Sequence, residues 1–256
     1  MRAYRISIAA VLLMTASPAA QWLNYPTAGL PRTADGKPNL SAPAPRTADG
    51  KPDLSGLWQS ASVYVGNIAK DLKPGDVPFQ PWAEALYKHR RATDSKDDPT
   101  ASCIPGGVPR ADLVPYPFKI LNAPGMVVML YEAVQSWRQI FTDGRKLPDD
   151  PQPTWMGYSV GRWDGDAFVV DTAGFNDKGW LDNGGRPATE LLHVVERFRR
   201  KDFGHMDIQI TIDDSKAYMK PWTAIQPLVF QADTELLEYI CNENNRYFDL
   251  VHDFGK

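Results

Sequence analysis

Apolar and polar residues alternate along most of the second half of the chain, and a period of two is typical of β-strands. The segment 79–92 differs, because Trp82, Ala85, Leu86 and His89 recur at helical spacing and predict one helix. Many short strands, tight turns and a single helix favour a barrel or a sandwich. We expect the barrel: a mainly-β fold in which an antiparallel β-barrel is accompanied by one or two short helices.

The first strand pair is predicted around a Pro-Gly turn. Residues 123–126, Ala-Pro-Gly-Met, place Pro and Gly where a type II turn needs them, between strands 118–122 and 127–132. The last strand is predicted at 236–242, near the closure of the sheet.

A second strand pair is predicted around Trp163-Asp164-Gly165-Asp166. Asp-Gly then occupies the centre of a two-residue turn, a strong signal for a hairpin. This register places Phe168 opposite Gly161 and Tyr158 opposite Asp171.

A third pair, residues 191–200 with 206–213, allows its register to be tested against the side chains. A three-residue loop, Asp202-Phe203-Gly204 with Gly in the left-handed conformation, sets apolar residues opposite apolar ones. A shift by one residue would set the isoleucines against charged residues instead. The expected pairs are Arg200 with Met206, Phe198 with Ile208, Glu196 with Ile210 and Val194 with Ile212, and on the other face Arg199 with Asp207, Arg197 with Gln209 and His193 with Asp213.

Glu196 is the one acidic residue in an otherwise apolar row of this hairpin. Burial disfavours a carboxylate, so the pKa of Glu196 should rise unless a cation lies beside it. A carboxylic acid in an apolar cavity can act as a general acid or base. The alternative is a structural Glu held by an Arg or by backbone donors.

His193 lies on the opposite face of the same strand, because neighbouring residues alternate, so Asp213 is a better partner for it than Glu196. An exposed ion pair is the alternative there. Tyr158 and Asp171 are expected to orient a substrate hydroxyl or to form a simple hydrogen bond. The candidate catalytic residues are therefore Glu196, Asp171, Tyr158 and His193, and the candidate substrate-binding residues are Arg197, Trp163, Asn176 and Trp180.

The N-terminus has the pattern of a secretory signal. Arg2 and Arg5 precede the apolar run 6–14, and small residues at 17–19 suit a cleavage site near Ala19 or Ala20. The run is too short to span a bilayer, which takes about 20 residues, so we expect no integral membrane segment after removal of residues 1–20. The location expected is secreted or periplasmic; a buried N-terminal helix is the alternative.

A near-exact duplication follows this signal. Residues 31–41 and 45–55 repeat Pro-Arg-Thr-Ala-Asp-Gly-Lys-Pro-Asn/Asp-Leu-Ser. Their Pro/Gly-rich composition favours an extended linker over 21–53, followed by a single barrel-like domain over 54–256.

Two cysteines, Cys103 and Cys241, are expected to form a disulfide in an oxidising compartment, with free buried thiols as the alternative. No metal is expected, because His193 and His205 lie roughly 20 Å apart along their hairpin. The sequence contains no dinucleotide or phosphate-binding motif, so no cofactor is expected. The net charge is −3, and the densest basic cluster is short and is followed at once by acidic residues: Arg197, Arg199, Arg200 and Lys201. A nucleic-acid partner is therefore not expected.

Two resemblances add to this interpretation. Gly56-Leu57-Trp58 resembles the Gly-x-Trp opening of lipocalin-like (calycin-type) barrels. Segments 46–58, 158–166 and 202–208 resemble a group of exported bacterial proteins of uncharacterised function that share an Arg-Thr-Ala-Asp-Gly-Lys-Pro-Asp-Leu-Ser-Gly-Leu-Trp motif. The resemblance implies export and a lipocalin-like fold, and no catalytic residues.

The leading hypothesis is an exported enzyme that acts by acid/base proton transfer on a small organic molecule in a barrel cavity. Elimination by a lyase, isomerisation and hydrolysis all suit such a site. The second hypothesis is a non-catalytic lipocalin-like binding protein for an apolar or aromatic ligand, suited by the eight Trp, ten Tyr and ten Phe.

Overall fold

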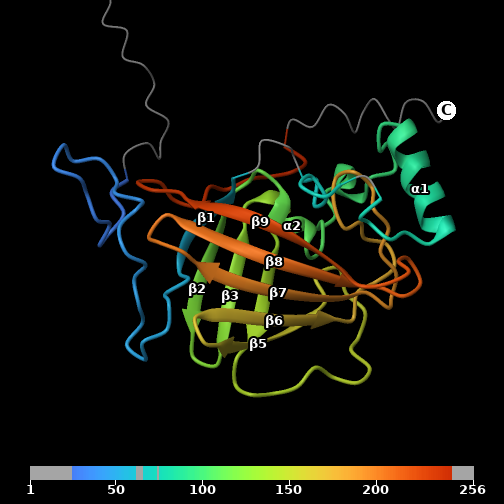
Figure 1. Ribbon diagram of the computed structural model, residues 1–256. Coiled ribbons are helices and arrows are strands. Elements are labelled where there is room, and N and C mark those ends of the chain that lie inside the picture. Colours follow the sequence, from blue (N-terminus) through green and yellow to red (C-terminus); the bar gives the residue numbers. More distant parts are fainter. Residues whose placement is uncertain (1–24, 62–65, 74, 244–256) are drawn as a thin grey trace, which may run out of the picture.

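Nine strands form a closed barrel in the computed structural model, which describes residues 25–61, 66–73 and 75–243 (Figure 1). The predicted signal, residues 1–20, lies outside the described residues. Two short α-helices and two 3₁₀ turns accompany the barrel. The strands are β1 (Gly56–Ser60), β2 (Phe118–Ala123), β3 (Met126–Tyr131), β4 (Trp137–Phe141), β5 (Tyr158–Asp164), β6 (Ala167–Ala173), β7 (His193–Arg200), β8 (His205–Asp213) and β9 (Trp222–Phe230); the helical elements are α1 (Pro81–Ala92), η1 (Pro99–Ser102), α2 (Arg110–Leu113) and η2 (Ala133–Gln135).

The barrel confirms the mainly-β prediction, with one parallel pair in place of a fully antiparallel sheet. Strands follow one another in chain order, and β1 pairs with β9 to close the sheet. Only β4 and β5 run parallel, and just two residue pairs join them, Ile140 with Ser159 and Phe141 with Val160. The wall is therefore least continuous between β4 and β5.

The first and third predicted hairpins form as expected. Ala123 pairs with Met126 across the Pro-Gly turn, and Gly125 has the positive φ of 71° that a type II turn needs. The register of β7 with β8 is the predicted one, from His193 opposite Asp213 to Arg200 opposite Met206. The match of apolar rows determined this register.

Two details of the turns differ from prediction. The β5–β6 register is shifted by two, so Tyr158 pairs with Ala173 and Asp164 with Ala167. The turn is centred on Gly165-Asp166, and Gly165, with φ of 59°, takes the first central position that a type II′ turn reserves for Gly. In the β7–β8 loop, Gly204 is not left-handed; its backbone instead approaches Leu40 closely.

One element prediction was wrong, and the predicted helix forms with a different buried face. Residues 236–242 form no strand, and the strand that closes the barrel is β9, where Pro227 argued against a strand in the sequence. Helix α1 begins two residues later than expected and buries Ala83, whereas Trp82, on the predicted buried face, is 47% exposed.

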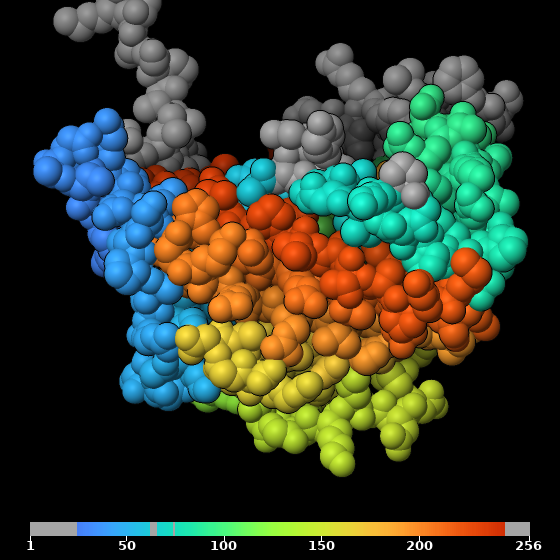
Figure 2. Space-filling model, viewed as in Figure 1, coloured from blue at the N-terminus to red at the C-terminus, as the bar shows by residue number. Residues whose placement is uncertain are grey.

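The duplicated segment, residues 31–55, lies against the barrel and is not extended. Each copy folds into a small turn in which a Thr amide donates to a Lys carbonyl four residues later, at 2.9 Å in both copies. Arg46 then contacts Asp166 at 2.8 Å in the β5–β6 turn, and Arg32 contacts Asp233 at 2.6 Å after β9. Figures 1 and 2 show this segment (blue) along one end of the barrel, opposite α1.

Large side chains fill much of the barrel interior, because alternate residues of each strand point inward. The fully buried set includes Trp58, Phe118, Phe168, Phe198, Met206 and Ile208. At the end near the duplicated segment the Arg200 guanidinium lies 4.8 Å over the Trp58 ring, and burial lowers the pKa of Arg200 to about 10.

The predicted disulfide between Cys103 and Cys241 is present, with 5.7 Å between the Cα atoms. It ties the segment after β9 to the loop before α2. Disulfides of this kind belong to oxidising compartments and fit a protein outside the cytoplasm. None of the described helices is long and apolar enough to cross a membrane.

Candidate functional site

Glu196 lies inside the barrel, fully buried, as the alternation of β7 predicts. Glu196 forms an ion pair there with Arg138 of β4, whose Nη2 donates to Glu196 Oε2 at 2.5 Å. The Arg138 side chain is itself only 1% exposed. The arrangement is the Arg-held Glu that the sequence left as an alternative to a catalytic one.

Two hydroxyls from the neighbouring strands hold the same guanidinium. Arg138 Nε donates to Ser159 Oγ of β5 at 2.9 Å, and Nη2 donates to Thr172 Oγ1 of β6 at 2.7 Å. These hydroxyls lie 3.0 Å apart. Because β4 to β7 are adjacent in the barrel, their inward rows bring these side chains together across more than fifty residues of sequence.

A second carboxyl joins them from α2, the short helix that packs against the barrel. Asp112 is fully buried, accepts from the Tyr131 hydroxyl at 2.9 Å, and lies 3.9 Å from Arg138 Nη1. Burial, and then the negative charge of Glu196, raise the pKa of Asp112 well above its ordinary value. Asp112 therefore holds a proton more strongly than an exposed aspartate does.

Tyr131 stays protonated as well, because burial and the nearby Asp112 raise its pKa well above 10. Asp112 Oδ2 and Glu196 Oε1 receive no donor from any described residue. We call the set Asp112, Tyr131, Arg138, Ser159, Thr172 and Glu196 the Arg138 network.

A cavity of about 470 Å³ lies beside this network, where β4 and β5 meet, and we call it the barrel-wall cavity. Arg138 and Ser159 line it, so its polar end is part of the network. Aromatic and sulfur-containing side chains supply much of the remainder: Trp137, Phe141, Trp155, Met156 and Tyr158.

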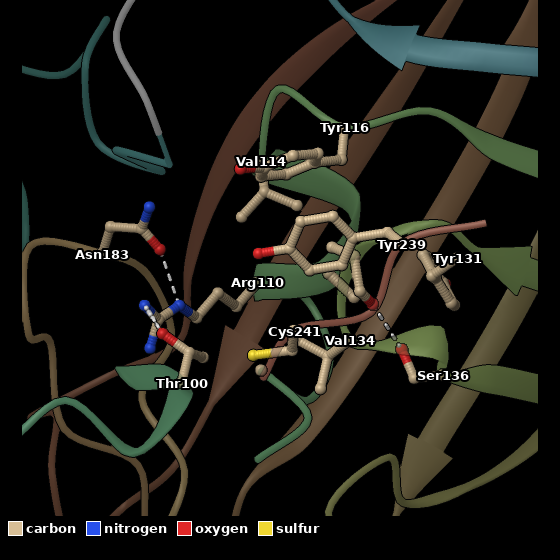
Figure 3. Close-up of a pocket in the computed structure, with 13 residues that line it drawn as sticks. Thr100, Arg110, Val114, Tyr116, Tyr131, Val134, Ser136, Asn183, Tyr239 and Cys241 are labelled. Carbon is tan, nitrogen blue, oxygen red and sulfur yellow. Dashed lines mark hydrogen bonds between the residues drawn. The ribbon is translucent and has the colours of Figure 1, made fainter. Parts of the chain in front are cut away.

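A smaller cavity of about 190 Å³ meets the network at Tyr131 (Figure 3). Figure 3 shows Tyr116 and Tyr239 on one side and Arg110 on the other, where Arg110 Nε donates to Asn183 at 2.6 Å. Val134 and Ser136, in and after η2, line both cavities. The network is thus bordered by two spaces on either side of one turn.

Tyr158 lies in the barrel-wall cavity, apart from Asp171. Its hydroxyl accepts from Arg145 Nη1 at 3.0 Å, and its ring stacks on Phe141 with centroids 5.2 Å apart. The predicted contact with Asp171 fails because the β5–β6 register is shifted by two.

Asp171, His193 and Arg197 lie on the outer face of the barrel, away from Glu196. Asp171 accepts from Arg162 and lies 3.6 Å from His193 Nε2, so His193 pairs with Asp171 and not with Asp213. Arg197 contacts Asp164 at 2.7 Å. These are cross-strand ion pairs on an exposed face.

The remaining predicted binding residues serve local packing. Trp163 packs on Phe168, with centroids 5.2 Å apart, and Asn176 Oδ1 accepts from the Lys178 amide. Trp180 is buried with a guanidinium, Arg90, 4.4 Å from its ring. The structure does not bring these three side chains to the barrel-wall cavity.

Sequence reasoning missed Asp112 and Arg138. Arg138 could have been found as Glu196 was. It is a charged residue on the inward face of a strand, two positions before the buried Ile140. No sequence pattern pointed to Asp112, because α2 has only four residues and lies in a Pro-rich segment. Among the described residues, no three His, Cys, Asp or Glu side chains could hold a metal ion.

Comparison with known proteins adds no name to this site. No protein-family model matches the chain, and no curated protein matches its sequence.

Proposed function

We propose that this protein binds a small aromatic or apolar organic molecule in the barrel-wall cavity. The observation that carries the proposal is the composition of that cavity, aromatic side chains around a fixed polar end. Its volume of about 470 Å³ lies in the range of small-molecule sites, which are apolar with a few placed polar groups.

The polar end is rigid, which favours recognition. Glu196, Ser159 and Thr172 hold the Arg138 side chain, which is only 1% exposed, so the residues behind the polar end of the cavity are ordered before a ligand arrives. Since Glu196 balances its charge, the cavity suits a neutral molecule with a hydrogen-bonding group better than a strong anion. The ring of such a molecule would lie among Trp137, Trp155 and Tyr158.

Acid/base catalysis is a second candidate, and the Asp112–Glu196 pair favours it. Burial raises the pKa of Asp112 well above its ordinary value, and a buried carboxyl of raised pKa beside a second carboxyl is an arrangement that can divide the roles of acid and base. Elimination or isomerisation would use both. Binding ranks first because Arg138 and Ser159, rather than the carboxyls, line the cavity.

We also propose that the protein works outside the cytoplasm as a lipocalin-like carrier. The disulfide supports this location, as does the secretory pattern of residues 1–20. The closed barrel supports the expected resemblance in fold.

The binding proposal is tested with N-phenyl-1-naphthylamine, a neutral aromatic probe that fluoresces in apolar sites. Trp137 is 60% exposed at the cavity, so Trp137→Ala removes an aromatic wall without damage to the core. We expect its dissociation constant for the probe to rise about tenfold, as for loss of one aromatic anchor. The matched control is Trp82→Ala on α1, another exposed tryptophan, which should bind as the wild type does.

Equal binding by both variants and the wild type would contradict the site. Catalysis is tested separately, by a search for turnover of any bound molecule in the wild type, Glu196→Gln and Asp112→Asn. Turnover that both substitutions abolish would establish the second candidate over the first.

A further inference from the structure

A third cavity, of about 670 Å³ and larger than the two already described, lies beside α1 at the end of the barrel away from the duplicated segment. We call it the α1 cavity. The segment before α1, the helix itself and the loop between β8 and β9 enclose it, and Met219 N donates to Pro78 O at 2.7 Å across their junction. Figure 2 shows these segments in contact on the right of the molecule. The lining residues of the α1 cavity and the barrel-wall cavity do not overlap.

One wall of the α1 cavity is aromatic. Phe79 and Tyr87 both line it, and their rings stack with centroids 5.3 Å apart and an angle of 19° between planes. The Arg186 guanidinium lies 4.8 Å from the Tyr87 ring. A planar group can pack against such a surface and meet a cation at its edge.

The lining is also cationic, in a protein whose net charge is −3. It contains Lys73, Lys88, Arg186 and Lys220 against a single carboxylate, Glu84. Glu84 already pairs with Lys88 at 2.7 Å. Both Lys73 and Lys220 are exposed lining residues, and neither forms an ion pair with a described carboxylate.

Arg186 is held in place before any ligand arrives. It is 7% exposed, pairs with buried Asp182, and donates from Nη1 to Asn67 at 3.0 Å. Its Nε donor is buried and has no partner among the described residues. The site therefore combines one fixed guanidinium with two free ammonium groups.

We propose that the α1 cavity binds a small organic anion that carries an aromatic ring. The ring packs on Phe79 and Tyr87, and the anionic group lies toward Lys73, Lys220 and Arg186. Cations focused in a cleft attract such a molecule, and the attraction weakens as salt screens it. This site is independent of the barrel-wall cavity, which suits neutral molecules.

The test uses the full mature chain and 8-anilinonaphthalene-1-sulfonate, an anionic aromatic probe, in fluorescence titrations. Lys73→Gln with Lys220→Gln removes two exposed charges and leaves the aromatic wall intact. We expect the double variant to bind the sulfonate probe about tenfold more weakly, and added salt to weaken only wild-type binding strongly. The matched control is Lys37→Gln, an exposed lysine in the duplicated segment.

Unchanged affinity of the double variant for the sulfonate would overturn the proposal. Equal loss of affinity for the neutral probe N-phenyl-1-naphthylamine would overturn it too, because charge would then not be what the lysines contribute. The neutral probe reports on the barrel-wall cavity, so failure at one site is distinguishable from failure at the other.

Discussion

At the scale of single residues, burial decides what each charge does in this protein. Arg197 with Asp164 and Arg138 with Glu196 are both Arg–carboxylate pairs at short distance. The first is exposed, where water screens charges and a pair contributes little. The second is buried, where loss of either partner leaves a charge without compensation.

Arg138→Met should therefore destabilise the fold by about 3–5 kcal/mol, because it leaves Glu196 as a buried carboxylate without a cation. Arg197→Ala should cost about 0–1 kcal/mol. Urea denaturation measures both. Adding Glu196→Gln to Arg138→Met should restore part of the loss, and equal free energies of unfolding for the two single variants would contradict this account.

The pH dependence of stability follows from Asp112. Its pKa is raised in the folded state, so its contribution is fully present below the unfolded pKa of about 3.8–3.9 and is lost as pH rises toward the folded pKa. Relative to Asp112→Asn, which holds no titratable proton there, wild-type stability should fall over that range by up to about 1.4 kcal/mol per pH unit. Denaturant titrations at several pH values measure the difference. A pH-independent difference would show that Asp112 titrates alike in both states.

At the scale of elements, side-chain pattern predicted faces and registers better than turns and ends. The β7–β8 register followed from the apolar rows together with the loop length, because a shift by one residue would set the isoleucines against charged residues. The β5–β6 register slipped by two because Asp-Gly and Gly-Asp turns compete in one four-residue stretch, yet the inward face was preserved since the slip is even. Strand β9, Trp222–Phe230, was not predicted from the sequence, and it contains a proline, which is uncommon inside a strand. The pairing of Arg138 with Glu196 depends on barrel closure, which no local pattern encodes.

Docking of the duplicated segment depends on Gly204. An added Cβ there would lie 2.4 Å from Leu40 Cβ and 3.0 Å from its Cα, so Gly204→Ala should cost about 1–3 kcal/mol by overpacking. Gly179→Ala, where a Cβ would meet nothing within 4 Å, is the matched control and should stay within about 1 kcal/mol of the wild type. Thermal unfolding of the two variants at one protein concentration compares them. If Gly204→Ala unfolds at the same midpoint temperature as the wild type, the duplicated segment moves away from the added methyl group without cost, which contradicts this prediction.

At the scale of the whole molecule, the barrel closes through β1 and β9, and a long-range crosslink holds the segment that follows. Cys103 and Cys241 are 138 residues apart, so their bond restricts the unfolded chain strongly. The same bond keeps Tyr239 and Cys241 at the smaller cavity (Figure 3).

Replacing both cysteines by serine should lower the free energy of unfolding by about 4–5 kcal/mol in the chain-entropy account. Addition of a reductant should bring the wild type to the level of the variant. Denaturation with and without reductant measures this. If the double serine variant is as stable as the oxidised wild type, the disulfide does not contribute to the stability of the barrel.

The most direct test of the central claim, that the barrel-wall cavity holds a small organic molecule, is native mass spectrometry of the protein purified from the cells that produce it. The wild type and Trp82→Ala should carry a small-molecule adduct that Trp137→Ala lacks. The bare mass of the mature chain in all three, or the same adduct in all three, would contradict it.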